Sequence, residues 1–313
     1  MRVIKGSEAY RTQSTGPGWD LGRPVVTIGT FDGVHRGHRA LLEALLARSV
    51  ELGVPSLVYT FEPSPRQVLQ PESCPPRILP VSEKLRLLEL AGVDIVVVEA
   101  FDAALGAQPP AWFAEEILGR RLQPVAMVVG YDFRYGKGRE GDAELLRLHL
   151  PEVPIQSVEA LVSDGRTVSS SAIREAVAEG HLDEAERLLG RPFHLVGTVV
   201  PGDQRGRELG FPTANLDREG ELLPPPGVYA VRCGPVGKEL IPAVANLGVR
   251  PTFGSRRFAV EVHLLDCDVD LYGQLMLVEF VQRLRPEQRF AGADELVARI
   301  RRDIAEARAI LIG

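Results

Sequence analysis

The sequence predicts two domains of different class: an α/β domain with a doubly wound parallel sheet, then a small antiparallel β-barrel with a C-terminal helix. Up to about residue 190, short apolar runs rich in valine and isoleucine alternate with helical segments, as in doubly wound α/β proteins. Beyond Gly190–Arg191–Pro192, strand-like runs follow one another with only turns and loops between them. The chain then ends in one amphipathic segment, residues 293–311, and this order is typical of a barrel covered by a helix.

Strands and helices alternate in the first domain. Five runs have the continuous apolar character of strands buried on both faces of a parallel sheet. They are residues 24–30, 56–61, 93–100, 124–130 and 154–160. The segments between them have apolar residues three and four positions apart, as amphipathic helices do. They are residues 38–53, 82–92, 110–120 and 142–150, with Ser82 as a candidate N-cap.

Two short helices, 171–180 and 182–190, precede the change to the second domain. Five strand-like runs follow in that domain. They are residues 193–200, 227–233, 240–249, 257–267 and 275–284. A length of 313 residues is sufficient for two domains. We place them at 1–188 and 189–313.

The composition is that of a globular protein with a full core, at 45% hydrophobic and 25% charged residues. The formal net charge is −6, which gives no electrostatic footprint for nucleic acid, and no basic helix suggests a membrane surface. The three cysteines form no CxxC pair, as is usual for reduced thiols. No run approaches the ~18 apolar residues of a membrane helix. We therefore expect a cytoplasmic protein without nucleic-acid or membrane partners; the sequence leaves its oligomeric state open.

The stretch Gly29–His38, GTFDGVHRGH, lies where the first predicted strand gives way to a helix. Open parallel sheets bind ligands at the carboxyl ends of their strands. Glycines let the backbone approach a phosphate closely, and the N–H groups of a helix's first turn attract anions. His35 and His38, three residues apart, can both face that anion and donate hydrogen bonds to it. The stretch therefore predicts a phosphate-binding loop.

Two other interpretations of this loop stay open. It could be a glycine turn with two surface histidines. It could also hold zinc through His35 and His38, although the sequence offers no evident third or fourth ligand. The loop lacks the GxxxxGK[ST] pattern of a P-loop.

Gly29-Thr30-Phe31-Asp32 with His35-Arg36-Gly37-His38 resembles the first signature of the HxGH nucleotidyltransferase superfamily. Val168–Arg174, VSSSAIR, is similar to the second signature, ISSTxxR. Thr60–Pro65, TFEPSP, and Val128–Asp142, VVGYDFRYGKGREGD, resemble the adenylyltransferase half of prokaryotic FAD synthetases. Those are bifunctional enzymes with riboflavin kinase and FMN adenylyltransferase in one chain, and the likeness covers nearly the whole length.

The resemblance implies that FMN phosphate attacks the α-phosphorus of ATP and that pyrophosphate leaves. Such a transfer needs positioning and charge neutralisation more than covalent chemistry. His35 and His38 would be catalytic, stabilising charge on the ATP phosphates. The implied ATP-binding residues are Gly29, Thr30, Phe31, Asp32, His35, His38, Ser169, Ser170 and Arg174. Taken alone, the serines and Arg174 would equally suit a capped helix start beside a solvated arginine.

Four residues are candidates for a flavin or adenine pocket. Asp132, Phe133 and Tyr135 lie just beyond a predicted strand end, and Phe61 follows the second strand. Core packing is an equally open interpretation for each aromatic side chain. The family often has histidine where Ser64 stands, so any role of that imidazole cannot be carried over to this chain.

A second glycine-rich stretch, Val199–Leu216, begins the barrel domain with VVPGDQRGRELGFPTANL. Its glycines predict a flexible loop and its arginines supply positive charge for phosphates. These residues are Gly202, Gly206, Gly210, Arg205 and Arg207. Thr213 and Asn215 are two residues apart, so on an extended segment their oxygens face the same way, and such oxygens suit Mg²⁺. PTAN alone, however, would most often be a turn.

This stretch closely resembles the riboflavin kinase signature, together with GVYA at Gly227–Ala230, NLGVRPTFG at Asn246–Gly254, EVHLLD and DLYG. The resemblance implies that Thr213 and Asn215 bind ATP phosphates and Mg²⁺ and that Glu261 is the catalytic base. The implied ATP-binding residues of the kinase are Gly202, Arg205, Gly210, Thr213 and Asn215.

Alternation along the strand around Glu261 supports this assignment. It predicts Phe258, Val260, Val262 and Leu264 on one face, and Arg257, Glu261 and His263 on the other. A glutamate there could accept the proton of the riboflavin 5′-hydroxyl as that oxygen attacks the γ-phosphorus of ATP. It could also be an exposed carboxylate paired with Arg257, which contributes little to stability.

The sequence therefore favours a bifunctional enzyme that converts riboflavin to FMN and FMN to FAD, each with ATP and Mg²⁺. One alternative is a riboflavin kinase whose first domain adenylylates poorly or uses another acceptor. A flavin-sensing protein without turnover is a further one. Neither channelling of FMN between the sites, nor affinities, nor any redox requirement for the flavin follows from the sequence.

Overall fold

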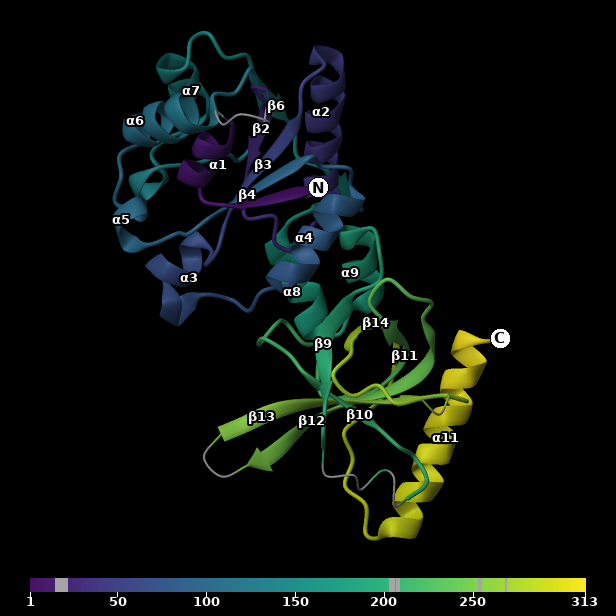
Figure 1. The fold of residues 1–313 in the computed structure, drawn as a ribbon. Coiled ribbons are helices and arrows are strands. Elements are labelled where there is room, and N and C mark those ends of the chain that lie inside the picture. The colour runs from purple at the N-terminus through teal and green to yellow at the C-terminus, as the bar shows by residue number, and fades with distance from the viewer. Residues whose placement is uncertain (15–21, 203–205, 207–208, 253–254, 268) are drawn as a thin grey trace. The chain divides into compact units, whose positions relative to one another are not determined.

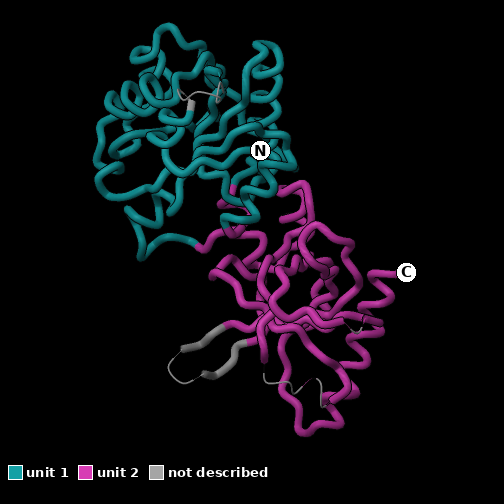
Figure 2. Tube along the Cα trace, viewed as in Figure 1, with its two compact units in different colours: residues 1–75, 81–169 teal, residues 76–80, 170–313 magenta. Residues whose placement is uncertain are grey.

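The computed structural model describes residues 1–14, 22–202, 206, 209–252, 255–267 and 269–313, with only the backbone for 14, 249–252 and 255–257. The chain forms two compact units of different architecture (Figures 1 and 2). Unit 1 is residues 1–75 and 81–169; unit 2 is residues 76–80 and 170–313. The α/β-then-barrel fold class is confirmed, while the domain boundary between residues 188 and 189 stays a prediction.

Unit 1 is built on a six-stranded parallel sheet in the order β1-β4-β3-β2-β5-β6. The strands are β1 (Arg2–Lys5), β2 (Val25–Ile28), β3 (Ser56–Phe61), β4 (Ile95–Glu99), β5 (Ala126–Gly130) and β6 (Ile155–Val158). Every residue of β2 is buried, and so is every residue of β3 except Phe61. The four-residue strand β1, which the sequence analysis did not predict, forms the edge beside β4.

Helices and one hairpin connect these strands. They are α1 (Ser7–Ser14), α2 (Arg36–Leu52), α3 (Pro65–Leu69), η1 (Pro71–Ser73), α4 (Val81–Leu90), α5 (Ala103–Gly106), α6 (Pro110–Trp112), η2 (Phe113–Leu122), η3 (Lys137–Arg139), α7 (Ala143–His149), β7 (Val162–Ser163) and β8 (Arg166–Thr167). Ser82 was predicted as an N-cap, and this is wrong: α4 begins at Val81, so Ser82 lies within its first turn. α6 continues into η2, which is wound one residue wider, as Gln123 N donates to the Leu118 carbonyl.

The strand order places the first predicted site at a topological switch point. From β2 the chain builds outward through β3 and β4 on one side and through β5 and β6 on the other. The ladder between β2 and β5 pairs only Val25 with Ala126 and Val26 with Met127. Ligands bind outside the carboxyl ends of strands at such a point, and Gly29–His38 follows β2 there.

Unit 2 contains a closed barrel in the order β10-β13-β12-β11-β14-β9. Its elements are α8 (Ser170–Glu179), α9 (Leu182–Leu189), β9 (His194–Val200), β10 (Ala214–Asp217), β11 (Gly227–Pro235), β12 (Ile241–Thr252), β13 (Ser255–Leu264), β14 (Leu275–Pro286) and α11 (Ala293–Leu311). α11 lies against the barrel (Figure 1). Its Ala307 and Leu311 pack against Val228, Ala230 and Val244 of the barrel wall. This covers part of the outer face of β11 and β12.

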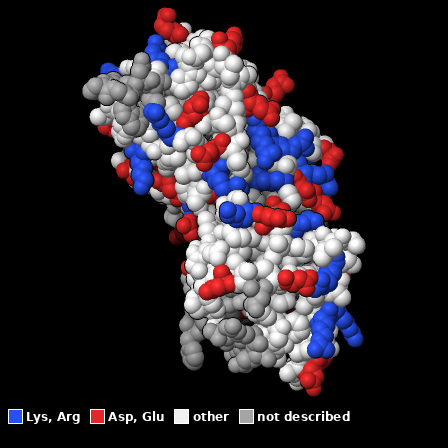
Figure 3. All heavy atoms as spheres, turned by 45° about the vertical axis from the view of Figure 1, so that its right-hand side comes forward, with Lys and Arg blue, Asp and Glu red and all other residues white. Residues whose placement is uncertain are grey.

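Charged side chains of both signs are scattered among uncharged ones on the face drawn in Figure 3, where Lys and Arg side chains form one dense area with acidic ones beside it. Among the residues that the structure describes, no helix combines the length and apolar character needed to cross a membrane.

Candidate functional sites

The loop after β2 has an unusual backbone. Phe31, Gly33 and Val34 have φ values of 50°, 87° and 38°, a left-handed region that residues other than glycine seldom adopt. The Phe31 side chain is fully buried, and its ring lies 5.1 Å from that of His38. Phe31 therefore anchors the loop, and its predicted contact with ATP stays a prediction.

His35 is the N-cap of α2. Its Nδ1 accepts a hydrogen bond from His38 N at 3.2 Å, and the two imidazole rings stack with centroids 3.6 Å apart. Because Nδ1 is an acceptor, the neutral ring carries its proton on Nε2 and donates from there. The sequence analysis predicted two anion-facing histidines but not that one of them caps the helix.

Gly37 brings this loop close to the second signature. A Cβ on Gly37 would lie 3.2 Å from His35 Cε1 and Nδ1 and 3.4 Å from the Val168 carbonyl oxygen. Val168 N donates to Leu161 O at 2.8 Å, at the base of the β7–β8 hairpin. The chain at Val168, immediately before Ser169, is thus packed against the start of α2.

Ser169 is the last residue of unit 1, and the rest of the second signature, Ser170–Arg174, belongs to unit 2. Ser170 opens α8, and both serines are half-buried. The Arg174 guanidinium donates from Nε to the Pro76 carbonyl at 2.9 Å, which fixes its orientation. A shared phosphate site of Ser169, Ser170 and Arg174 with the two histidines stays a prediction.

Lys84 is a residue of this region that the sequence analysis missed. It is buried on the inner face of α4, and its Nζ lies 3.3 Å from the Thr30 carbonyl oxygen and 3.2 Å from Thr60 Oγ1. Its sequence signal was a lysine three and four residues before Leu87 and Leu88, which are also buried. At such spacing a charged residue shares the buried face of a helix.

The aromatic candidates lie partly within the core. The Phe61 ring makes edge-to-face contacts with Tyr59 and Phe101, with centroids 5.2 and 5.6 Å apart. Phe133 stacks on Tyr135 at 5.5 Å. Tyr135 is only 6% exposed, so its ring serves mainly the core, and burial raises its pKa to about 12.

Asp132, by contrast, is exposed. Ser64, where relatives often have histidine, caps α3: its Oγ accepts from Gln67 N at 3.4 Å, and its own N donates to Gln67 Oε1 at 2.8 Å. A contribution of these side chains or of Phe61, Phe133 and Tyr135 to a flavin pocket stays a prediction.

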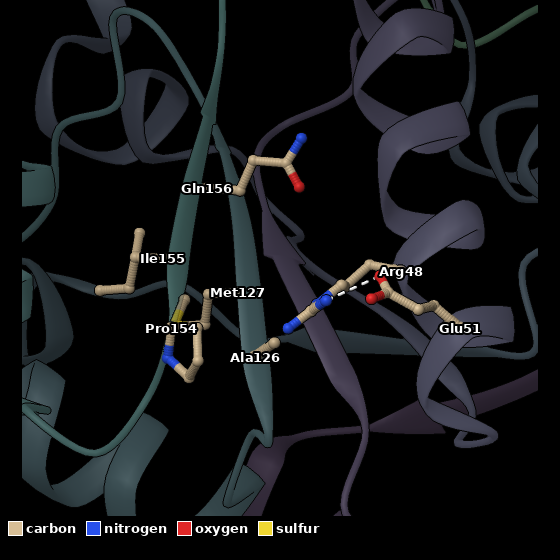
Figure 4. A pocket seen from close by; sticks show the side chains of 7 residues that line it. All are labelled: Arg48, Glu51, Ala126, Met127, Pro154, Ile155 and Gln156. Carbon is tan, nitrogen blue, oxygen red and sulfur yellow. Dashed lines mark hydrogen bonds and ion pairs between the residues drawn. The ribbon is translucent and has the colours of Figure 1, made fainter.

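A hollow of about 210 Å³ lies at the opposite edge of the same sheet (Figure 4). Its lining includes the Arg48–Glu51 ion pair of α2 and the first residues of β5 and β6. The hollow lies where β5 and β6 begin, whereas the predicted phosphate loop follows the end of β2, so this hollow is separate from the predicted site.

In the barrel, strand register brings the predicted kinase residues together. Asn215 of β10 lies directly opposite Glu261 of β13, and Glu261 lies opposite Asn246 of β12. Directly opposed residues share a face of the sheet. Asn246 belongs to a motif of the riboflavin kinase resemblance, but the sequence did not predict that it lies beside Glu261.

Asn215, Glu261 and Asn246 lie on the outer face of the barrel wall. Val260 and Val262 are buried inside the barrel, whereas Glu261 and His263 are half-buried. Phe258, predicted on the face of the two valines, is 43% exposed near the end of the strand.

Two glycines lie against the PTAN segment. A Cβ on Gly202 would overlap the Asn215 amide, and one on Gly206 would lie 3.3 Å from Thr213 Oγ1. Gly210 has a φ of 85° with nothing near it, so its role is conformational. Arg205 and Arg207 lie outside the described residues, as does the side chain of Arg257.

His263 ties this segment to β13. Its Nδ1 donates to the Pro212 carbonyl at 2.8 Å, and its ring meets Phe211 edge-on with centroids 5.9 Å apart. Pro212 immediately precedes Thr213, so His263 holds in place the residues predicted to bind phosphate and metal.

The donors of this segment fit Mg²⁺. A threonine hydroxyl and an asparagine amide oxygen are oxygen ligands, and Mg²⁺ completes such sets with water and substrate phosphates. Among the described residues, no group of three His, Cys, Asp or Glu side chains could hold a metal ion. The zinc interpretation of His35 and His38 gains no third ligand from that part of the chain.

Comparison with known proteins gives two family matches and close full-length relatives. Residues 19–172 match the FAD synthetase family model and residues 189–311 the riboflavin kinase model. The bifunctional riboflavin kinase/FMN adenylyltransferase of Escherichia coli K12 is 44% identical over 91% of each chain. The Pseudomonas fluorescens protein of that name is 41% identical over 99% of this chain and 98% of its own. A solved structure named macrolide-efflux protein, from Streptococcus pneumoniae, has a TM-score of 0.85 and 28% identity, covering 98% of this chain and 99% of its own.

Proposed function

The chain belongs to the bifunctional riboflavin kinase/FMN adenylyltransferase family, and from this we propose how its two units divide the reactions. Unit 2 phosphorylates riboflavin to FMN with ATP. Unit 1 adenylylates FMN to FAD with a second ATP and releases pyrophosphate. The observation that carries the proposal is the pairing of Asn215 with Glu261, in a chain whose other unit has a histidine-capped helix at a sheet switch point.

In the kinase reaction the riboflavin 5′-hydroxyl oxygen attacks the γ-phosphorus and ADP leaves. Glu261 takes the hydroxyl proton, and Thr213 and Asn215 orient the phosphates. Mg²⁺ bound with Thr213 and Asn215 would neutralise phosphate charge. The half-buried position of Glu261 on β13 supports this role, because a rigid strand fixes the carboxylate relative to the paired Asn215.

In the adenylyl transfer a phosphate oxygen of FMN attacks the α-phosphorus, and the bond to pyrophosphate breaks. The helix N-terminus and the Nε2–H of His35 supply donors for the charge that develops. Ser169, Ser170 and Arg174 hold the β- and γ-phosphates. The stacked arrangement of His35 and His38 supports their joint action, since the contact fixes both rings.

The first test is chromatography of the purified chain incubated with riboflavin, ATP and Mg²⁺. FMN should appear first and FAD second, and chelation of Mg²⁺ should stop both. FMN alone would favour a single-activity kinase, and flavin binding without any product would favour a sensor.

Variants then separate the sites. His38→Ala should abolish FAD formation from FMN and leave FMN formation largely intact. Loss of both activities together would contradict independent sites. A cytoplasmic location, and the absence of nucleic-acid and membrane partners, stay predictions.

A further inference from the structure

Lys84 is a buried titratable residue that the reaction scheme does not use. It is 7% exposed, in the second turn of α4, and reaches the carboxyl ends of two neighbouring strands. One contact is the Thr30 carbonyl oxygen, just after β2, and the other is Thr60 Oγ1, near the end of β3. Removing an ammonium group from water is costly, so a buried lysine at this point calls for a specific explanation.

Both of these contacts converge on one peptide group. Thr60, which is fully buried, donates from its hydroxyl to the Thr30 carbonyl at 3.4 Å and accepts from Lys84 Nζ at 3.2 Å. The Thr30 carbonyl thus receives two donors, one of them the lysine ammonium at 3.3 Å. Its orientation is fixed from the inner side of the loop.

Fixing that carbonyl also fixes the next N–H. In a trans peptide the C=O and N–H bonds point in opposite directions, so the Phe31 N–H points away from Lys84. A cation at the carbonyl oxygen polarises the peptide and strengthens its N–H as a donor. Within the described part of the chain, the Phe31 N–H has no acceptor. Because the whole of Phe31 is buried, this N–H acts on the predicted phosphate loop from beneath its surface.

We propose that Lys84 is a positioning residue of the adenylyltransferase site. Its ammonium holds the Thr30 carbonyl, and with it the Thr30–Phe31 peptide of the loop, and it places a fixed positive charge behind that loop. This rests on the proposed function of unit 1. The proposed role affects binding of the ATP phosphates and not of the flavin. It can therefore be tested by comparing KM values for the two kinds of substrate.

The test uses the full chain and the reverse reaction, in which FAD and pyrophosphate give FMN and ATP. Pyrophosphate is used because it binds where the β- and γ-phosphates of ATP are proposed to bind. Lys84→Met should raise KM for ATP and for pyrophosphate about tenfold and lower kcat, with KM for FAD within about twofold of the unaltered chain. Lys84→Gln, which keeps an N–H donor without the charge, should behave similarly. Lys84→Arg should recover most of the loss.

The controls distinguish this role from simple packing. Lys5→Met removes the same charge from an exposed position in the same unit and should change nothing. If Lys84→Met does not fold, Lys84→Gln and Lys84→Arg decide. An equal rise of KM for pyrophosphate and FAD, or no rescue by arginine, would overturn the positioning role. A chain that forms no FAD at all would instead overturn the proposed function and this inference with it.

Discussion

Asn215 and Glu261 lie directly opposite each other on β10 and β13 of the closed barrel. Cβ atoms of such pairs are about 4.5–5.5 Å apart. β10 is only four residues long and directly follows Pro212 and Thr213. The pairing therefore fixes the positions of Thr213 and Asn215, the predicted phosphate ligands, relative to Glu261, the predicted base.

We expect Glu261→Gln to slow FMN formation by roughly 10²–10⁴-fold, the usual effect of losing a general base. The amide keeps the size of the side chain but cannot accept the hydroxyl proton. The measurement is the initial rate of riboflavin phosphorylation at saturating Mg·ATP. FAD formation from supplied FMN is the internal control and should be unchanged. A near-normal kinase rate would remove Glu261 from the mechanism.

His35 is a helix cap, and its proposed role as a phosphate donor can be separated from that one. His35→Ala removes both and should lower the free energy of unfolding by about 1 kcal/mol, the typical effect of losing an N-cap. His35→Asn retains an acceptor for His38 N and should keep the stability of the unaltered chain. Both variants should lose FAD formation by roughly 10²–10³-fold. Thermal unfolding and FAD synthesis from FMN are measured on the same samples; full activity of the asparagine variant would reduce His35 to a cap.

His263 should control nucleotide binding in the kinase without contacting the flavin. His263→Ala frees the Pro212 carbonyl, so we expect KM for Mg·ATP to rise roughly tenfold, with a smaller change for riboflavin. His263→Asn places an amide N–H near the position of Nδ1 and should restore part of the affinity, whereas His263→Gln places it farther out and should not. Steady-state kinetics with each substrate varied in turn checks this. Equal behaviour of the Asn and Gln variants would exclude the Pro212 contact as the cause.

Glu221 predicts a pH-dependent stability. It is 4% exposed in the loop between β10 and β11, and within the described residues neither carboxylate oxygen has a hydrogen-bond partner. Burial raises its pKa above the ordinary value, an effect that the backbone N–H of Glu221 itself and then the nearby Arg218 partly oppose. The folded state therefore holds this proton more tightly than the unfolded state, and stability is lost as pH rises between the unfolded and the folded pKa.

Glu221→Gln should therefore increase the free energy of unfolding at pH 7.5, by on the order of 1 kcal/mol, the low end of the cost of a buried unsatisfied group. The gain should vanish below about pH 4, where glutamate is protonated in both states. Thermal denaturation at the two pH values tests this. A gain of equal size at both would show that ionisation is not its source.

Much of the architecture could be predicted because apolar runs and helical spacing follow directly from burial. β1 was missed because four residues with one buried side chain carry almost no periodic signal. Lys84 was missed because a charge in an amphipathic helix is normally assigned to solvent, and only the packed sheet shows where its Nζ ends.

The sites divide in the same way. Glycines, histidines and the PTAN residues could be proposed as site residues because their chemistry is local. The neighbours of Glu261 could not, since a strand's partners depend on the order of strands in the closed barrel. Asn215 and Asn246 are 31 positions apart in the numbering and flank the same glutamate.

The close approach of Gly202 to Asn215 has a genetic consequence. A single added methyl at that position would displace the Asn215 amide while leaving unit 1 untouched in sequence. Such an allele would make a chain that produces FAD only from FMN supplied by another source. In a cell where this chain is the sole source of both flavins, growth would then depend on imported FMN. Unit 1 would still convert that FMN to FAD, so riboflavin could no longer replace it.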